Sequence, residues 1–197
     1  MTAVVPPADI GSYWLASCDD DLTPRPPLSG DETFDVAIMG GGFTGLWTAW
    51  YLLQNDPDLS IAIVERQFCG FGASGRNGGW CSPRFPINPA ALTRRFGAAT
   101  ARAMLLAQQA MVSEVGRICE EEGIDAHFNP AGVLTLARSA EQLPSLRQSF
   151  EAYAALGMED GCELLDADTA RAEVHATAVH GALCLRGGGT VHPGRLV

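Results

Sequence analysis

The chain has 197 residues, and its hydrophobic content of 47% is enough to bury the core of one domain and part of a second. The formal net charge of −10 argues against binding to nucleic acid or to an anionic membrane, since either partner needs a basic face. All 13 basic residues are arginines, which excludes a P-loop lysine, a Schiff-base lysine and a lysine general base.

Residues 1–30 are expected to form an irregular N-terminal arm. Residues 1–10 contain two prolines, no basic residue and no apolar core, so they do not predict a signal peptide. Residues 11–15 are apolar enough to dock on the protein. The three aspartates at 19–21 and the prolines that follow them argue against regular structure in the rest of the arm.

Residues 35–65 predict a strand, a glycine turn, a helix and a second strand. The turn, Gly40 to Gly45, has the spacing G-x-G-x-x-G, and Glu65 follows its last glycine by 20 residues. The uncharged stretch 36–55 is long enough for a membrane span, but the four glycines at its centre favour a buried strand–turn–helix. Because strand, turn, helix and acid occur in this order, the segment predicts a dinucleotide site rather than a merely structural turn.

Each part of this motif has a physical role in holding an adenine dinucleotide. Gly40 allows the tight turn, Gly42 lets the backbone approach a pyrophosphate, and Gly45 lets the helix pack on the strand. The helix N-terminus offers free N–H groups and the positive end of its dipole to the phosphates. Glu65 is placed to accept hydrogen bonds from the ribose hydroxyls.

The predicted helix 46–55 is apolar on more than one side, which predicts that it is covered on both sides. After it, Asn88-Pro89 predicts a capped helix start that ends at Gly97, and a longer helix is expected over 98–122. Gly116 weakens that longer helix by about 1 kcal/mol relative to alanine.

The second half of the chain alternates strands and helices. A strand is expected at 132–137, and Ser139 with Gln142 resembles a capping box for the next helix. Short strands near 162–165 and 180–185 are expected to bracket a small helix capped by Asp166. Pro193 predicts the first residue of a final helix.

Residues 68–80 form a glycine-dense loop at the point where an NAD-binding unit usually continues into an ordinary helix. They read Phe-Cys-Gly-Phe-Gly-Ala-Ser-Gly-Arg-Asn-Gly-Gly-Trp. Such a loop can lie along an extended ligand and offer backbone N–H groups without steric bulk. The loop therefore favours FAD over NAD.

The glycine turn, the Glu65-Arg66 pair and the loop at 70–79 together closely resemble the FAD-dependent oxidoreductases of the D-amino-acid-oxidase-like family, and within it the gamma-glutamylputrescine oxidase group. Three further segments resemble the same group: residues 12–14, 26–30 and 188–196. The resemblance implies hydride transfer from the C–N bond of a small amine or amino acid to FAD, with oxygen as the acceptor. A small molecule is then the expected partner.

The resemblance also implies which residues hold FAD. In the turn and the strand after it they are Gly40, Gly42, Phe43, Thr44, Gly45 and Glu65, with Arg66 near the adenosine. In the loop, at the pyrophosphate-to-ring end, they are Ala73, Ser74, Arg76, Asn77 and Gly78. The resemblance assigns no catalytic residue, and no metal is expected.

The expected fold class is α/β, a Rossmann-like FAD-binding βαβ unit followed by the beginning of an α+β substrate domain. The expected boundaries are an arm at 1–30, the first part of the FAD domain at 31–125, the start of the substrate domain at 126–190 and a return to the FAD domain at 191–197. Since the family's flavin domain is discontinuous, the resemblance implies an N-terminal portion that binds flavin without turning over substrate.

Alternative functions are an NAD-dependent dehydrogenase and a non-catalytic flavin-binding fragment. Ser74 is one glycine short of the hydrolase elbow G-x-S-x-G, and the four histidines lack metal-ligand spacing. Cys81 follows the loop closely, although a buried inert thiol is the favoured interpretation. The six cysteines form no C-x-x-C pair, which predicts reduced thiols and a cytoplasmic protein.

Overall fold

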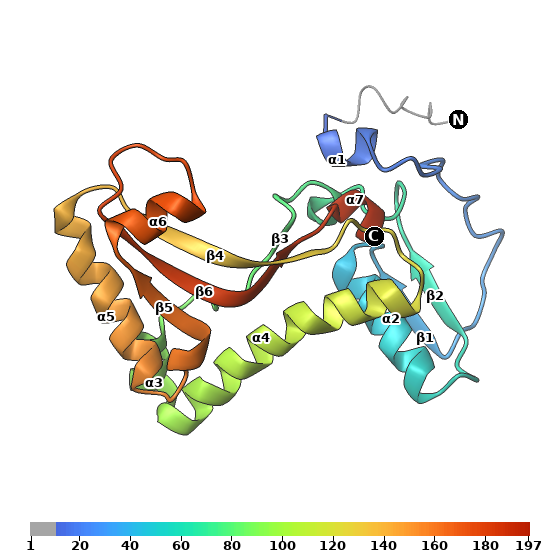
Figure 1. The fold of residues 1–197 in the computed structure, drawn as a ribbon. Coiled ribbons are helices and arrows are strands. Elements are labelled where there is room, and N and C mark those ends of the chain that lie inside the picture. Colours follow the sequence, from blue (N-terminus) through green and yellow to red (C-terminus); the bar gives the residue numbers. More distant parts are fainter. Residues whose placement is uncertain (1–10) are drawn as a thin grey trace. The chain divides into compact units, whose positions relative to one another are not determined.

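The computed structural model describes residues 11–197, so the first ten residues of the expected arm lie outside the described residues. The described chain divides into two compact units (Figure 1). Unit 1 contains residues 11–79, 124–127 and 191–197, and unit 2 contains residues 80–123 and 128–190. The functional domain boundaries given above remain a prediction. Within residues 11–197, no helix combines the length and the apolar character that a membrane span requires.

Unit 1 is built on the predicted strand–turn–helix–strand. Strands β1 (Val36–Met39) and β2 (Ile61–Val64) pair in parallel, with Val36 opposite Ile61 and Met39 opposite Val64. Helix α2 (Phe43–Asn55) connects them and buries Gly45 and Ala49. Parallel strands joined by a helix are the βαβ arrangement that the sequence predicts.

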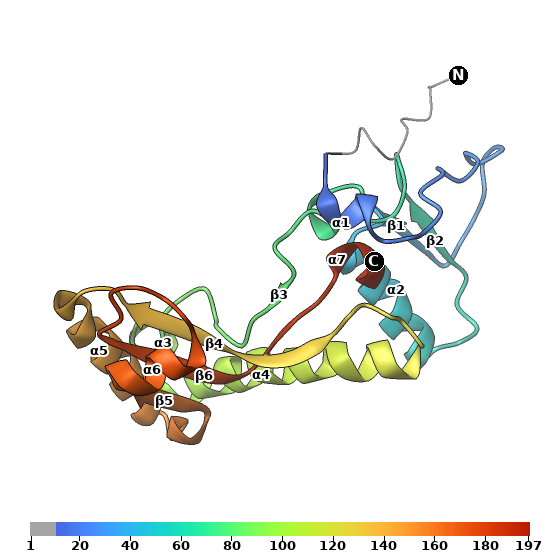
Figure 2. The same cartoon turned by 45° about the horizontal axis from the view of Figure 1, so that its top comes forward.

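Two short helical turns complete unit 1. The expected arm is not irregular throughout, because residues Tyr13–Ala16 form the turn α1, in which Leu15 is only 2% exposed. At the other end of the chain, Pro193–Leu196 form α7, which begins at the predicted proline. Figure 2 shows α1 beside α7, and α7 also contacts the 3₁₀ turn η2 (Ala73–Gly75) of the glycine-rich loop.

Unit 2 is an antiparallel sheet with β6 (Gly181–Thr190) as its central strand. Strand β4 (Asn129–Ala137) pairs along one edge of β6. Along the other edge, β3 (Trp80–Cys81) pairs with one end of β6 and β5 (Cys162–Leu165) with the other. The strands predicted at 132–137 and 180–185 are therefore confirmed, and both are longer than expected.

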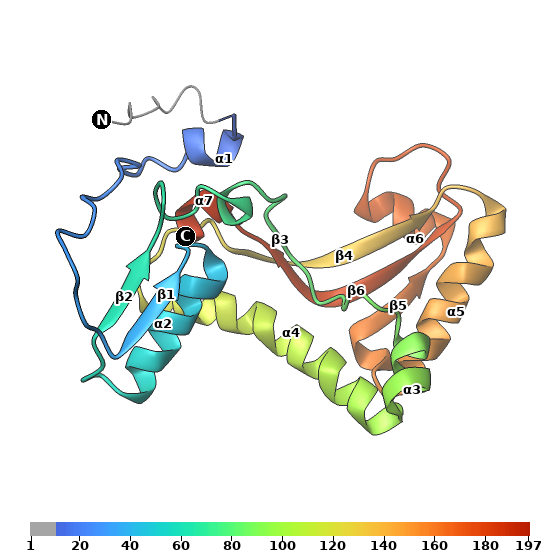
Figure 3. The same ribbon diagram turned by 180° about the vertical axis from the view of Figure 1, so that it is seen from behind.

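Helices cover both faces of this sheet (Figure 3). They are α3 (Pro89–Phe96), α4 (Ala98–Glu121), α5 (Leu143–Ala154) and α6 (Ala167–Glu173), with 3₁₀ turns η3 (Ala140–Gln142) and η4 (Glu159–Gly161) beside α5. Leu183 joins a buried cluster with Leu92 and Leu105, while the adjacent Ala182 packs with Ala170 of α6. Because successive strand residues point to opposite faces, α6 lies on one face and α3, α4 and α5 lie on the other.

The capping box predicted at Ser139 is wrong. The Ser139 side chain makes no cap hydrogen bond, and the Gln142 side chain accepts instead from the Arg138 N–H at 2.6 Å. The predicted caps at Asn88 and Asp166 are confirmed, because each side chain accepts at 2.8 Å from an N–H in the first turn of its helix. The capping-box pattern fails at Ser139 because the Gln142 side chain has another local hydrogen-bond partner.

Gly116 has a packing role that helix propensity does not reveal. A Cβ atom added at Gly116 would lie 2.5 Å from a ring carbon of Phe128, and two further ring carbons lie 3.0 Å away. The cost of a glycine in α4 is therefore offset by the close approach of this ring to the helix backbone.

Candidate functional site

Two glycines of the turn after β1 are required by the backbone itself. Gly40 has a φ of +100°, in the region that residues with a side chain rarely adopt, and its N–H donates to the Val64 carbonyl at 2.8 Å. A Cβ atom on Gly45 would lie only 2.2 Å from the Gly40 carbonyl oxygen and 3.1 Å from Ile38. Helix α2 can thus lie against β1 only because Gly45 has no side chain.

The N-terminus of α2 lies directly against the glycine-rich loop. Gly42 is the N-cap residue and has no side chain with which to cap the helix. The Phe43 N–H donates to the Ser74 hydroxyl at 2.9 Å, and a Cβ on Gly42 would lie 2.8 Å from the same oxygen. Because the first-turn N–H groups of a helix lack intrahelical partners, this end of α2 is suited to bind an anion beside Ser74.

Glu65, one residue past β2, is held at the same turn. One carboxylate oxygen accepts from the Gly41 N–H at 2.9 Å, and the other accepts from the Gln67 N–H at 3.0 Å. These bonds, the one from Gly41 first, lower the pKa of Glu65, so the side chain is a carboxylate at neutral pH. A carboxylate has about four acceptor sites, so it can also accept a hydrogen bond from a hydroxyl group.

The loop of residues 70–79 is braced from within. The Asn77 amide donates to the Ser74 carbonyl at 2.7 Å, and its oxygen accepts from the Gly79 N–H at 2.9 Å. Arg76 donates from Nε to the Phe71 carbonyl at 2.7 Å and places its guanidinium 4.9 Å from the centre of the Phe71 ring. Asn77 and Arg76 therefore shape the loop, while Ser74 joins it to α2.

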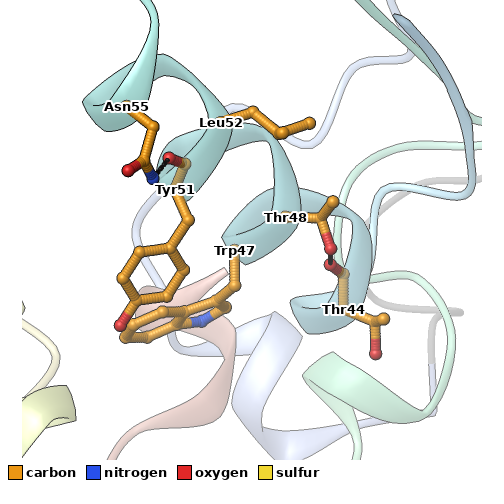
Figure 4. A pocket seen from close by; sticks show the side chains of 6 residues that line it. All are labelled: Thr44, Trp47, Thr48, Tyr51, Leu52 and Asn55. Carbon is orange, nitrogen blue, oxygen red and sulfur yellow. Dashed lines mark hydrogen bonds between the residues drawn. The ribbon is translucent and has the colours of Figure 1, made fainter.

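The remaining predicted residues lie at the surface around this turn. Arg66 is exposed beside Glu65, and Ala73 and Gly78 are exposed on the loop. Thr44 is exposed in the first turn of α2, where it helps to line an open hollow of about 450 Å³ (Figure 4). The structure thus joins the glycine turn, Glu65 and Ser74 by direct contacts and leaves these four residues at their margin.

The hollow on α2 corrects one expectation about this helix. Its lining residues all come from α2, and Figure 4 shows Tyr51 and Trp47 along one side. Tyr51 and Leu53 are each 40% exposed, so the cover expected on both sides of α2 is not present within residues 11–197.

The structure gives little support to a reactive Cys81 or to a nucleophilic Ser74. Burial, and then the neighbouring Cys119, raise the pKa of Cys81, which makes this buried thiol unreactive. The Ser74 hydroxyl is engaged with the helix N-terminus rather than with a base. Among the described residues, no group of three or more histidine, cysteine, aspartate or glutamate side chains is placed to hold a metal.

Sequence reasoning missed the support that α1 and α7 give to the loop. The Ser12 hydroxyl donates to the Gly75 carbonyl at 3.0 Å, and a Cβ on Gly75 would lie 2.6 Å from Leu15. On the α7 side, the Val191 N–H donates to the Gly79 carbonyl at 2.9 Å. The sequence predicted that residues 11–15 dock on the protein, and residues 12–14 and 188–196 resemble one family, but neither signal indicated that the loop is their partner.

Comparisons with known proteins show the family to which the chain belongs. The family described as FAD dependent oxidoreductase matches residues 35–197. Gamma-glutamylputrescine oxidoreductase of Escherichia coli strain K12 is 34% identical over 186 residues, which cover 92% of this chain and 42% of that relative.

Solved structures show the same fold. Glycine oxidase from Geobacillus kaustophilus matches with a TM-score of 0.61 at 25% identity, over 83% of this chain and 42% of that one. L-amino acid deaminase from Proteus vulgaris matches with a TM-score of 0.67 over 88% of this chain and 43% of that one, and at 16% identity it shows the fold alone. The chain therefore spans about two fifths of the length of these proteins.

The residues present fit the cofactor of that family. The N-terminus of α2 with the Ser74 hydroxyl beside it suits a pyrophosphate, and the Glu65 carboxylate suits a ribose. The family match covers both the turn and the loop from which these features come. This chain is a member of the FAD dependent oxidoreductase family, to which the D-amino-acid oxidases give their name.

Proposed function

We propose that this chain supplies the ADP-binding half of a FAD site in an enzyme that oxidises the C–N bond of a small amine or amino acid. The observation that carries the proposal is the hydrogen bond from the Phe43 N–H to Ser74, because it joins the two glycine-rich segments into one surface. A dinucleotide that lies across the first segment must continue along the second.

The pyrophosphate is assigned to the N-terminus of α2. Gly40 and Gly45 hold the helix against β1, so that its first N–H groups point at the ligand. Gly42 has no side chain of its own, so the Ser74 hydroxyl can lie against this end of the helix. The Ser74 hydroxyl, which already accepts from Phe43, adds a donor proton for a phosphate oxygen at the same place.

The adenosine is assigned to the end of β2. Glu65 accepts hydrogen bonds from the two ribose hydroxyls and is kept charged by the Gly41 N–H. Arg66, exposed one residue further on, lies near the adenine side. Ala73, Arg76, Asn77 and Gly78 then line the path from the pyrophosphate toward the flavin ring.

Bound FAD supplies the hydride acceptor for oxidation of the carbon next to nitrogen, with oxygen as the expected acceptor of the electrons. The names of two relatives, gamma-glutamylputrescine oxidoreductase and glycine oxidase, support an amine or amino acid as substrate. All six cysteines are free, which supports a reducing compartment such as the cytoplasm.

The 197 residues are expected to bind FAD without turning over substrate. Met39 of β1 is 95% exposed and Val64 of β2 is 48% exposed, so apolar side chains of the two-stranded sheet face solvent. A parallel sheet is normally covered on both faces. This exposure favours a second candidate function, in which these residues by themselves bind flavin without catalysis.

The test is a titration of the purified chain with FAD and, separately, with NAD and FMN. FAD is expected to bind at least tenfold more tightly than FMN, because FMN lacks the adenosine monophosphate part of FAD, and ADP is expected to compete with FAD. Binding of FAD and of FMN is measured by flavin fluorescence. Binding of every ligand is measured by the shift in the thermal unfolding temperature. Tighter binding of NAD than of FAD would favour the dehydrogenase alternative, and equal binding of FMN and FAD would contradict the assigned half-site.

A further inference from the structure

Leu15 is a buried apolar residue in a segment to which the proposed FAD site assigns no role. It belongs to α1, and its side chain is only 2% exposed. Leu15 occupies the space that a side chain on Gly75 would need, because a Cβ built there would lie 2.6 Å from Leu15 Cδ2. Leu15 therefore packs directly on the backbone of η2, the turn that contains Ser74.

Ser12, the N-cap residue of α1, makes a hydrogen bond at the same point. Its hydroxyl donates to the Gly75 carbonyl at 3.0 Å, and its oxygen accepts from the Leu15 N–H. One side chain thus both caps α1 and holds Gly75. The place of η2 is set by α1 through a hydrogen bond and a packing contact together.

Helix α1 is also anchored on its other side, by α7. A Cβ on Gly194 of α7 would lie 2.7 Å from the Trp14 carbonyl oxygen, so the two backbones are in close contact. The Ser17 hydroxyl and His192 Nε2 lie 3.1 Å apart in a hydrogen bond. Because α1 is held between η2 and α7, it can act as a support for the loop.

Ser74 is the residue through which this support reaches α2. It directly precedes Gly75 in η2, and its carbonyl accepts from the Asn77 amide at 2.7 Å. Its hydroxyl accepts from the Phe43 N–H at 2.9 Å. Phe43 is the first residue of α2, so its N–H has no partner within the helix, and its hydrogen bond depends on where Ser74 lies.

We infer that Leu15 and Ser12 are positioning residues for Ser74: they fix η2 so that the Ser74 hydroxyl stays at the N-terminus of α2. Leu15 is buried against Gly75 and Ser12 is bonded to its carbonyl, so both act through the loop backbone. The expected effect on FAD affinity rests on the proposed function, whereas the link from Leu15 to the Phe43 N–H does not.

The experiment is amide hydrogen exchange, followed by NMR, on the chain without ligand. The Phe43 amide reports the contact with Ser74, and Ala49, buried in the middle of α2, reports unfolding of the helix. In Leu15→Ala, exchange at Phe43 relative to Ala49 is expected to rise about fivefold, as for the loss of one hydrogen bond. Leu15→Met keeps the volume of the side chain and is expected to restore the native ratio.

The matched control is Leu92→Ala in unit 2. Leu92 is 0% exposed within its own cluster, so its truncation leaves a cavity of the same kind away from η2. This variant is expected to unfold at a lower temperature while the exchange ratio of Phe43 to Ala49 stays native. A role of Leu15 in general packing alone would leave that ratio unchanged in Leu15→Ala as well.

Ser12→Ala tests the hydrogen bond without opening a cavity. It removes the donor to the Gly75 carbonyl and is expected to raise exchange at Phe43 in the same direction as Leu15→Ala. Ser12→Thr keeps the hydroxyl and is expected to behave as the native chain does. If Leu15→Ala does not fold, this pair decides the proposal.

FAD affinity is measured on the same variants in a double-mutant cycle. Leu15→Ala is expected to weaken FAD binding about fivefold when Ser74 is present. In a Ser74→Ala background the same change is expected to weaken binding by less than about twofold, because the hydroxyl through which it acts is already absent. Equal effects in the two backgrounds would show that Leu15 does not act through Ser74.

Native exchange at Phe43 in both Leu15→Ala and Ser12→Ala would overturn the proposal, and so would an equal rise in Leu92→Ala. If the native chain binds no FAD, the proposed function fails, and exchange at Phe43 still decides whether α1 positions Ser74.

Discussion

Replacement of Gly45 by alanine is expected to destabilise unit 1 and to weaken FAD binding. The new Cβ would lie 2.2 Å from the Gly40 carbonyl oxygen, which is backbone and cannot rotate away. Helix α2 must then move off β1, and overpacking of this kind costs about 1–3 kcal/mol of the free energy of unfolding. Because the helix N-terminus moves with it, FAD affinity is expected to fall at least tenfold.

The matched control is Gly72→Ala in the glycine-rich loop. A Cβ at Gly72 meets nothing within 4 Å, and its φ of −75° suits alanine. Thermal unfolding and FAD titration of both variants separate a specific contact from a general effect of removing glycine. A Gly45→Ala variant as stable as Gly72→Ala, with native FAD affinity, would show that close packing of α2 on β1 is not required.

Replacement of Glu65 by glutamine is expected to weaken FAD binding while leaving the fold in place. Glutamine replaces one acceptor oxygen by an amide NH2, so the N–H of either Gly41 or Gln67 loses its acceptor, and the side chain carries no charge. Hydrogen bonds to charged groups contribute about 1.5–3 kcal/mol, which corresponds to an affinity roughly 10- to 100-fold weaker. FMN, which lacks the adenosine ribose, is expected to bind both forms equally.

Glu163→Gln is the control for loss of one negative charge. Glu163 is exposed on β5 in unit 2, where it pairs with Arg186 at 2.8 Å. Since the pKa of Glu65 is lowered, its contribution is lost only as the pH falls below the ordinary glutamate value of about 4.3. The contribution of Glu65 to FAD affinity is therefore expected to be the same at pH 7.5 and pH 5. Equal FAD affinity in Glu65→Gln and Glu163→Gln would remove Glu65 from the site.

The nucleotide turn could be predicted from the sequence because its geometry is local. Gly40 and Gly45 are required by backbone conformation and by contact with a neighbouring strand, and such constraints leave a short motif with fixed spacing. The caps at Asn88 and Asp166 were predictable for the same reason. The capping box at Ser139 was wrong because Gln142 has another local partner, and spacing alone does not rank the two.

The support of the loop could not be predicted because it joins distant parts of the chain. Ser17 and His192 are separated by 175 residues and meet in one hydrogen bond. No periodicity or spacing links them, and a lone histidine before proline has no distinctive pattern. The packing of Gly116 against Phe128 could not be predicted either. Helix propensity predicts that alanine at position 116 would stabilise the helix, whereas the Phe128 ring leaves no room for its Cβ atom.

The proposed FAD surface consists of the N-terminus of α2, Glu65 and the loop at 70–79. Its test is the change in backbone amide NMR shifts when FAD is added to the purified chain. We expect the largest changes at Gly41, Phe43 and Ser74, with amides of the unit 2 sheet such as Leu183 unmoved. Changes centred on the α2 hollow or on unit 2, with Gly41 and Phe43 unaffected, would contradict it.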